Sequence, residues 1–313
     1  MTEPSHTSSL SRPLVVWRLL DGKPGHESQS LGLVQALGRL REVRCEDMPV
    51  AGLGLGLFSW LLGRFTPGFM KPRPDLVVGA GHATHWPLLC ARRAYGGRIL
   101  ALMKPSLPCA WFDWVVAPEH DDVSGAHVIV TRGVLNAMQP GRKQAGRVLV
   151  LVGGVSKHFI WDDARVMVQI EAILAAFPQA LITDSRRTPD SLRKELAARY
   201  AGFYQPWNLC PPGWLAAELA MADSVWVSED SVSMIYESLT AGCAVGLIGL
   251  QRPVQAPGRL VRGLTALADA GLVVRFDDWH AGQALRAAEP PLREADRVAA
   301  QICEDMAGAG GQA

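Results

Sequence analysis

The sequence predicts an α/β protein with two Rossmann-like domains, each built on a parallel sheet that helices cover on both faces. Short apolar runs recur along the chain and alternate with segments of helical periodicity, which is the pattern of buried parallel strands. Residues 14–40 and 147–177 both read as a strand, a glycine-bearing loop and a helix. The length of 313 residues suits two domains.

The first half opens with the apolar run Leu14–Leu20, which ends at a turn. Apolar residues at every third position from Leu31 to Leu40 then predict a helix over residues 27–40. A second helix, rich in small residues, is expected to run through Arg93. The further strands expected in this half are residues 74–79, 98–103, 114–117 and 126–131.

The second half repeats the alternation. Asp162 is a plausible cap for a helix over residues 162–177, because an Asp side chain can accept from the first free N–H groups. The strands expected here are residues 147–152, 180–183, 224–227 and 244–250. The remaining helices expected are residues 189–200, 214–222, 231–241 and 286–310.

The segment Pro140–Gly146 is polar and turn-rich, and is the expected linker. It separates an N-terminal domain over residues 12–140 from a C-terminal domain over residues 146–285, with a terminal helix or tail over residues 286–313. In open α/β sheets, ligands bind outside the carboxyl ends of the strands. We therefore expect a ligand in a cleft between two sheets that face each other.

Composition excludes several classes of protein. Lys and Arg number 31 against 30 Asp and Glu, so bulk charge does not favour nucleic acid as a partner. The six cysteines show no CxxC motif or zinc spacing, which favours reduced thiols and a cytoplasmic location. The polar N-terminus lacks the features of a signal peptide. No HExxH motif is present, and we expect neither a metal nor a cofactor.

The loop Gly22–His26 precedes the first helix, where free N–H groups bind oxyanions. It matches neither a Walker A motif nor GxGxxG, and a plain turn is the alternative. His26 is a candidate base or anion ligand, and Asp21 is a second candidate base. Other polar residues follow strands of this half and are expected at the same edge: Lys23, His82, Lys104, Ser106, Glu119 and His120.

Gly153–Lys157 is a second glycine-bearing loop. Gly153 and Gly154 would let a ligand approach the backbone, while Ser156 would donate to a phosphate and Lys157 would neutralise it. Arg186 follows another strand and is a candidate to bind a diphosphate. A tight turn and a solvated loop are the respective alternatives.

The stretch Ser228–Met234 places small polar residues between a strand and a helix. Ser231 and Ser233 would lie in the first turn of that helix, where hydroxyls and free N–H groups suit phosphate, provided Glu229 and Asp230 point elsewhere. Glu237 is a candidate acceptor for ribose hydroxyls. The alternatives are an ordinary N-cap and a solvated carboxylate.

Residues 51–62 carry no charge. Twelve residues of helix reach only about 18 Å, too short to cross a bilayer. One interpretation is a buried helix or a domain-packing element. The other is a monotopic patch of Leu57, Phe58, Trp60 and Leu61, which would make the protein peripheral on the inner face of a membrane.

Several of these motifs, in this order, resemble the mitochondrial-fission "elongated mitochondria"-like family, which also occurs in bacteria. The resemblance covers residues 14 to about 250 and is specific, because many motifs recur in sequence. It rests on residues 21–33, 103–108, 112–113, 118–121, 131–133, 153–159, 183–189 and 229–234.

The resemblance implies a GT-B-like fold. The second half is also similar to the lipid-linked N-acetylglucosaminyltransferases of peptidoglycan synthesis, where matching residues hold the diphosphate and ribose of a nucleotide-sugar. The matching positions are Gly153, Gly154, Ser231, Ser233 and Glu237. Two departures are Lys23-Pro24, where those enzymes have further glycines, and residues 207–212, which leave the nucleobase side open.

The resulting hypothesis is a glycosyltransferase that uses a UDP-sugar or another nucleotide-sugar as substrate. The second domain would bind this donor, and the first would bind a glycan or lipid-linked acceptor of the cell envelope, with His26 or Asp21 as base. Two alternatives stay open: a non-catalytic membrane-associated adaptor and a nucleotide-sugar epimerase.

Overall fold

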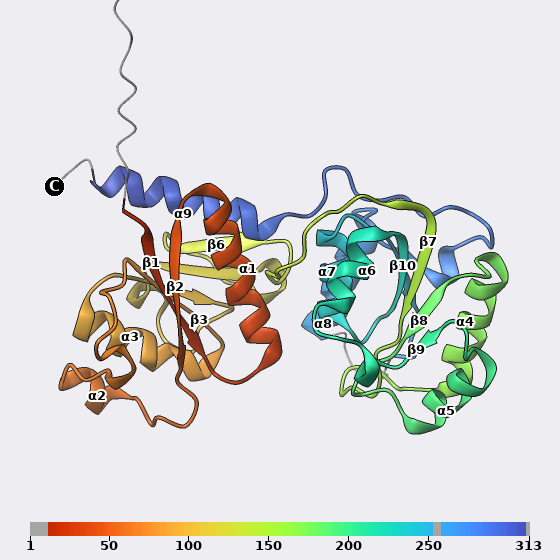
Figure 1. Cartoon of the computed structure of the whole chain (residues 1–313), viewed down its shortest axis with the longest axis horizontal. Helices are drawn as coiled ribbons and strands as arrows, with labels where there is room; N and C mark the ends of the chain where they lie inside the picture. Colours follow the sequence, from red (N-terminus) through yellow and green to blue (C-terminus); the bar gives the residue numbers. More distant parts are fainter. Residues whose placement is uncertain (1–11, 253–257, 311–313) are drawn as a thin grey trace, which may run out of the picture. The chain divides into compact units, whose positions relative to one another are not determined.

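The structure is a computed structural model that describes residues 12–252 and 258–310. These residues form two compact units. The N-terminal unit contains the chain up to Ala117, Val123–Val130 and the chain from Ala295, and the C-terminal unit contains Pro118–Asp122 and Thr131–Glu294. Each unit has its own six-stranded sheet (Figure 1).

The sheet of the N-terminal unit has the order β2-β1-β3-β4-β5-β6. Strand β1 pairs in parallel with both β2 and β3, and β3–β4 and β4–β5 are also parallel. The strands are β1 (Leu14–Leu20), β2 (Val43–Pro49), β3 (Leu76–Ala80), β4 (Arg98–Leu102), β5 (Trp114–Pro118) and β6 (Val128–Thr131). The long helices are α1 (Pro24–Leu40), α3 (His85–Tyr95) and α9 (Glu294–Gly310), with the short α2 (Leu57–Leu61).

The sheet of the C-terminal unit has the order β12-β11-β10-β7-β8-β9, and all of its pairs are parallel. The strands are β7 (Gln144–Leu151), β8 (Leu181–Thr183), β9 (Tyr204–Gln205), β10 (Ala222–Ser228), β11 (Ala244–Ile248) and β12 (Val274–Arg275). The helices are α4 (Asp163–Ala176), α5 (Asp190–Arg199), α6 (Trp214–Met221), α7 (Val232–Thr240) and α8 (Arg259–Asp269).

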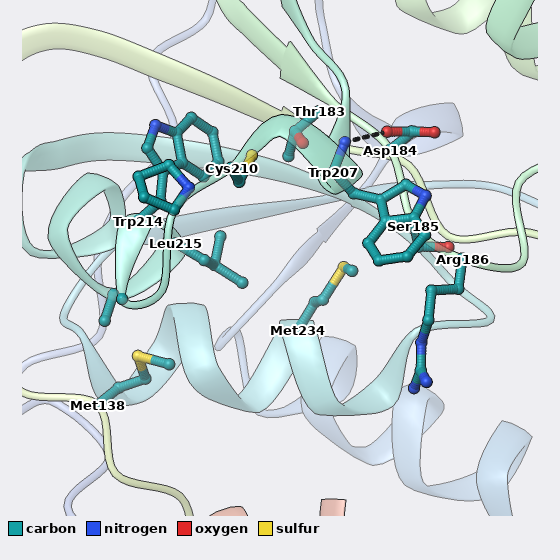
Figure 2. Close-up of a pocket in the computed structure, with 13 residues that line it drawn as sticks. Met138, Thr183, Asp184, Ser185, Arg186, Trp207, Cys210, Trp214, Leu215 and Met234 are labelled. Atoms are coloured by element: carbon teal, nitrogen blue, oxygen red, sulfur yellow. Dashed lines mark hydrogen bonds between the residues drawn. The ribbon is translucent and has the colours of Figure 1, made fainter. Parts of the chain in front are cut away.

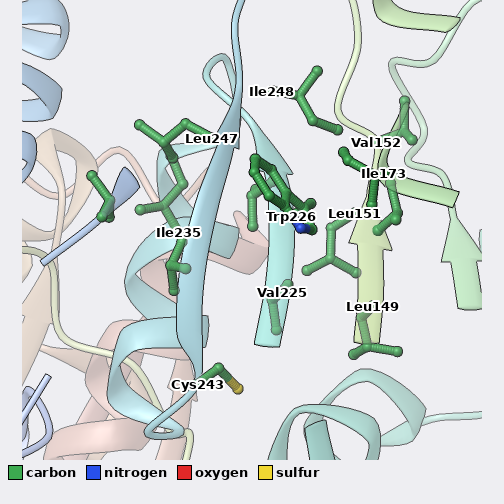
Figure 3. Close-up of a cluster of buried hydrophobic side chains, with 14 of the residues drawn as sticks. Leu149, Leu151, Val152, Ile173, Val225, Trp226, Ile235, Cys243, Leu247 and Ile248 are labelled. Atoms are coloured by element: carbon green, nitrogen blue, oxygen red, sulfur yellow. The ribbon is translucent and has the colours of Figure 1, made fainter. Parts of the chain in front are cut away.

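A buried tryptophan lies in the core of each unit. Trp17 is fully buried on β1, where its ring centroid lies 5.1 Å from that of Tyr95 and 5.9 Å from that of Phe65. Trp226 is fully buried on β10 among aliphatic residues of β7 and β11 (Figure 3), and its centroid lies 4.8 Å from that of Trp279. Because both strands are covered on both faces, their apolar runs show no alternation.

Most expected elements are present within a few residues of their predicted bounds. Strand β1 matches its prediction, and the Asp162 side chain caps α4 by accepting from the N–H groups of Ala164 and Arg165. The sequence does not predict strand β2, because its residues are largely polar. In the structure most of them are exposed or half-buried. As an edge strand it needs no continuous apolar run.

The segment before β7 packs with the C-terminal unit. The Asn136 side-chain amide donates to the carbonyl of Tyr236 and to Thr240 Oγ1, at 3.4 and 3.0 Å, and Tyr236 donates to the carbonyl of Arg132. The expected linker, residues 140–146, therefore does not mark the change of unit, and its last residues already belong to β7.

The C-terminal segment, expected as a separate helix or tail over residues 286–313, instead contains a helix that packs with the N-terminal unit. Arg39 of α1 forms an ion pair with Asp296, and the Trp114 indole donates to Asp305 at 2.8 Å. Both acidic residues lie on α9. Residues 295–310 therefore complete the N-terminal unit, although the C-terminal unit precedes them in the sequence.

Candidate nucleotide-binding site

A pocket of about 400 Å³ opens in the C-terminal unit beside the end of β8 and the start of α7 (Figure 2). It is mainly apolar, with the carboxyl end of β8 on one side and α7 on the other. Its position at the carboxyl ends of parallel strands is where open α/β sheets bind ligands. The lining residues include Met138, Asp184, Arg186, Trp207, Trp214 and Met234.

Asp184 holds the Trp207 side of the pocket in place. Its buried carboxylate accepts from the Trp207 backbone N–H at 2.7 Å and from Arg193 Nε at 2.7 Å. The first of these bonds is the dashed line in Figure 2. Arg193 also donates to the Ser185 carbonyl. One carboxylate therefore fixes both the end of β8 and the turn that presents the indole.

Asp184→Ala is expected to lower the free energy of unfolding by about 2–3 kcal/mol, because it leaves the part-buried Trp207 N–H and Arg193 Nε without their acceptor. Urea unfolding measures the change. Asp190→Ala is the matched control, since Asp190 is the exposed partner of the same Arg193. We expect its cost to stay below about 0.5 kcal/mol. Equal effects of the two substitutions would contradict the assigned role of Asp184.

The first turn of α7 offers unused donors. Ser231 is the N-cap residue of the helix, but its side chain makes no capping hydrogen bond. Within the described residues, the hydroxyls of Ser231 and Ser233 and the N–H groups of residues 232–234 have no hydrogen-bond acceptor. Such a helix start attracts anions.

Glu229 and Asp230 point away from that helix start, as the sequence requires. The buried Glu229 carboxylate accepts from the Leu250 backbone N–H at 3.0 Å. Asp230 accepts from Ser228 Oγ at 2.7 Å and from the Gly154 N–H at 3.0 Å, and forms an ion pair with Arg187 at 2.8 Å. Burial raises the pKa of Asp230.

The two glycines of the second loop pack against the protein itself. A Cβ on Gly153 would lie 2.4 Å from the Asp230 carboxylate oxygens, and one on Gly154 would lie 2.0 Å from the Arg187 carbonyl oxygen. Their N–H groups donate to Ser228 and Asp230. The expected reason for these glycines, close approach of a ligand, is therefore corrected: the close neighbours are the loop's own partners.

Glu237 lies one turn beyond Ser233 on α7, and residues four apart share a helix face. Burial raises the pKa of its carboxyl to about 7. Within the described part of the chain this carboxyl forms no hydrogen bond or ion pair. A half-ionised acceptor at neutral pH is thus available beside the helix start.

Of the remaining residues predicted to bind the donor, one lines the pocket and two do not. Arg186 lines the pocket and has no ion pair among the described residues. Lys157 is exposed, and Ser156 Oγ accepts from the His158 N–H at 3.3 Å. Neither lines the pocket. Sequence reasoning missed Asp184, whose partner Trp207 is 23 residues away, and it named residues 207–212 only as a departure from the related enzymes that leaves the nucleobase side open.

In the N-terminal unit, the structure brings together the two predicted bases. His26 Nδ1 lies 2.8 Å from Asp21 Oδ2, and the Asp21 side chain is almost fully buried. A carboxylate oxygen only accepts, so Nδ1 donates in this bond, and Nε2 is the ring nitrogen left for another partner. The ring lies against Gly81, where a Cβ would be 2.2 Å from His26 Cε1. The Asp21 carboxylate therefore orients the His26 imidazole.

The other predicted acceptor-side residues are more scattered. Lys23 Nζ lies 4.0 Å from Asp21, and Lys104 and His82 are exposed. Ser106 contacts the buried His85, whose pKa is lowered to about 4 by burial and by His82. Glu119 and His120 belong by their contacts to the C-terminal unit, not to the unit in which they were predicted.

Several solved structures are similar to this chain over most of its length. A UDP-N-acetylglucosamine 2-epimerase aligns with a TM-score of 0.57 and 12% identity, covering 96% of this chain and 97% of the other. A protein from Listeria monocytogenes assigned to the same activity gives 0.53 and 11%, covering 94% and 88%. MurG from Acinetobacter baumannii gives 0.47 and 14%, covering 93% and 91%.

At these identities the similarity concerns the fold alone. Together with the two six-stranded sheets, it shows that the chain has the predicted GT-B-like α/β fold. A search of curated proteins finds no match. The family model described as mitochondrial fission ELM1 matches residues 24–306, nearly the whole sequence. The motifs that suggested this relationship lie within or beside that range, and the chain belongs to the mitochondrial fission ELM1 family.

Proposed function

We propose that this protein is a glycosyltransferase that uses a nucleotide-sugar donor, such as a UDP-sugar, and acts on a glycan or lipid-linked acceptor of the cell envelope. The observation that carries the proposal is the pocket of the C-terminal unit. Its lining includes the Trp207 and Trp214 indoles, Arg186 and Met234. Arg186 has no ion pair among the described residues, and Met234 belongs to the first turn of α7, whose N–H groups are unused.

Each group of this site suits one part of a nucleotide. Trp207 offers an aromatic surface on which a nucleobase stacks. Arg186 and the start of α7, with Ser231 and Ser233, suit the two phosphates, since the helix dipole and a guanidinium both favour negative charge. Glu237, when ionised, accepts from two ribose hydroxyls.

In the proposed sugar transfer, the N-terminal unit supplies the base. The acceptor oxygen forms a bond to the anomeric carbon of the sugar, and the bond from that carbon to the diphosphate oxygen breaks. His26 Nε2 takes the proton of the acceptor hydroxyl, and Asp21 stabilises the resulting imidazolium. The departing diphosphate keeps the electron pair, and Arg186 with the start of α7 stabilises its charge.

Calorimetry with UDP, GDP and their sugars tests donor binding. Trp207→Ala is expected to weaken the best ligand about tenfold, because stacking on an aromatic side chain contributes roughly 1–1.5 kcal/mol. Trp111→Ala is the matched control, as this partly exposed indole lies in the N-terminal unit. The Trp111→Ala variant should bind the ligand with the same affinity as the unmodified protein.

The outcomes separate the alternatives. Sugar transfer from the bound donor to an envelope acceptor supports the proposal. Interconversion of the sugar without transfer would establish an epimerase instead. Absence of binding to every nucleotide in the panel would rule out both enzymes and favour an adaptor.

A further inference from the structure

The short helix α2 exposes its apolar side. Leu57, Phe58, Leu61 and Leu62 are 53%, 79%, 58% and 59% exposed. Positions i, i+1, i+4 and i+5 share one helix face, which in an ordinary surface helix would be turned to the core. None of the α2 residues is buried, so the interpretation of this segment as a buried helix is wrong. We call these four residues the α2 face.

A tryptophan-lined pocket of about 290 Å³ adjoins the α2 face. Leu57 belongs to both, and the pocket is otherwise lined by Trp60, Trp86, Leu89, Arg92 and Trp111. The lining is almost entirely apolar, which disfavours a sugar, because sugar hydroxyls need hydrogen-bonding partners. Tryptophan is the residue enriched where proteins meet the headgroup region of a bilayer.

The chain segment that carries the α2 face has charged residues of one sign only. Residues 48–74 contain no Asp or Glu, and contain Arg64, Lys71 and Arg73. Arg64 and Arg73 are exposed and form no ion pair within the described part of the chain, whereas Lys71 pairs with Glu46. Arg93 lies over the Trp60 ring at 5.9 Å. A cationic border beside an exposed apolar face complements an anionic lipid surface.

We propose that the N-terminal unit docks on an anionic bilayer through the α2 face, with the apolar side chains inserted among the lipids and Arg64 and Arg73 against the headgroups. Phe69 and Met70, 75% and 89% exposed, follow within eight residues and extend the apolar surface along the chain. Among the described helices none is long and apolar enough to cross a bilayer, so this contact is peripheral. The inference does not depend on the proposed transferase activity.

Flotation of the full-length protein with phosphatidylglycerol-containing vesicles tests the proposal. Phe58→Ser is expected to lower the partition coefficient at least fivefold, because it removes the most exposed side chain of the α2 face. Val168→Ser on α4 of the C-terminal unit is the matched control, a 62% exposed apolar residue that should leave binding unchanged. Thermal midpoints of both variants check that folding is preserved.

A second variant tests the charge. Arg64→Ser with Arg73→Ser should weaken binding to anionic vesicles roughly 25-fold, at about fivefold per lost cation near the surface, and leave the weak binding to phosphatidylcholine vesicles unchanged. The proposal is overturned if the unmodified protein does not float, or if Phe58→Ser binds like Val168→Ser. It is also overturned if Phe58→Ser instead converts a dimer to a monomer in light scattering, which would make the α2 face an interface between copies.

Discussion

His26→Gln is expected to lower the turnover number for sugar transfer by about 10²- to 10⁴-fold, the usual contribution of a general base. Glutamine fills similar space but cannot accept the proton of an acceptor hydroxyl at neutral pH. The Kd of the donor should change less than twofold, because the pocket of the C-terminal unit is untouched. Single-turnover kinetics with the donor found by the binding panel and the acceptor found by the transfer assay measures the effect.

Two companion variants sharpen this test. Asp21→Asn should reduce turnover less than His26→Gln and shift its pH profile, because the imidazole keeps its place but loses the carboxylate that stabilises its charged form. His127→Gln removes an exposed histidine of the same unit that is not a site candidate, and should be nearly silent. Full turnover in His26→Gln would show that another group removes the proton.

The second large effect concerns Glu237. Its pKa of about 7 means that the folded protein favours the protonated carboxyl, so the stability contributed by this residue is present below its ordinary pKa and is lost as pH rises through 7. Glu237→Gln removes the titration. The variant should match the unmodified protein at pH 4 and exceed its free energy of unfolding by about 3 kcal/mol at pH 8.

Nucleotide binding should change in the opposite direction. The ionised carboxylate accepts from ribose hydroxyls, so donor affinity of the unmodified protein should fall about tenfold from pH 8 to pH 6 as Glu237 is protonated. Glu237→Gln should bind more weakly at pH 8 and show no such pH dependence. Glu195→Gln, an exposed carboxylate on α5, is the control for both measurements. A Glu237→Gln variant that keeps the pH dependence would remove this residue from the site.

The fold was predictable wherever strands are buried on both faces. Strand β1 and the strand β10 before Ser228 are largely apolar runs, a pattern typical of strands that helices cover on both sides. Strand β2 could not be predicted in the same way, since only one side of it pairs and its Arg44, Cys45 and Asp47 are exposed. The packing of α9 also depends on contacts with Arg39 and Trp114, far away in the sequence.

In the candidate site too, contacts between residues close in sequence were predictable, and contacts between distant elements were not. Asp21 follows β1 and His26 lies in the first turn of α1, only five residues further on, so their pairing is a local property that the sequence could indicate. The bond from the Trp207 N–H to Asp184 joins two elements that only the folded sheet brings together. A glycine pair shows that something approaches the backbone closely. It does not show whether the neighbour is a ligand or, as at Gly154, the carbonyl of Arg187.

The return of α9 to the N-terminal unit has a consequence for synthesis. The ribosome makes the N-terminal strands first, but residues 295–310, which Arg39 and Trp114 contact, emerge last. The C-terminal unit, complete once Glu294 has left the exit tunnel, can therefore finish folding before the unit that began earlier. Until then the surfaces that α9 will cover stay open to chaperones, and a chain cut short near its end would keep them open permanently.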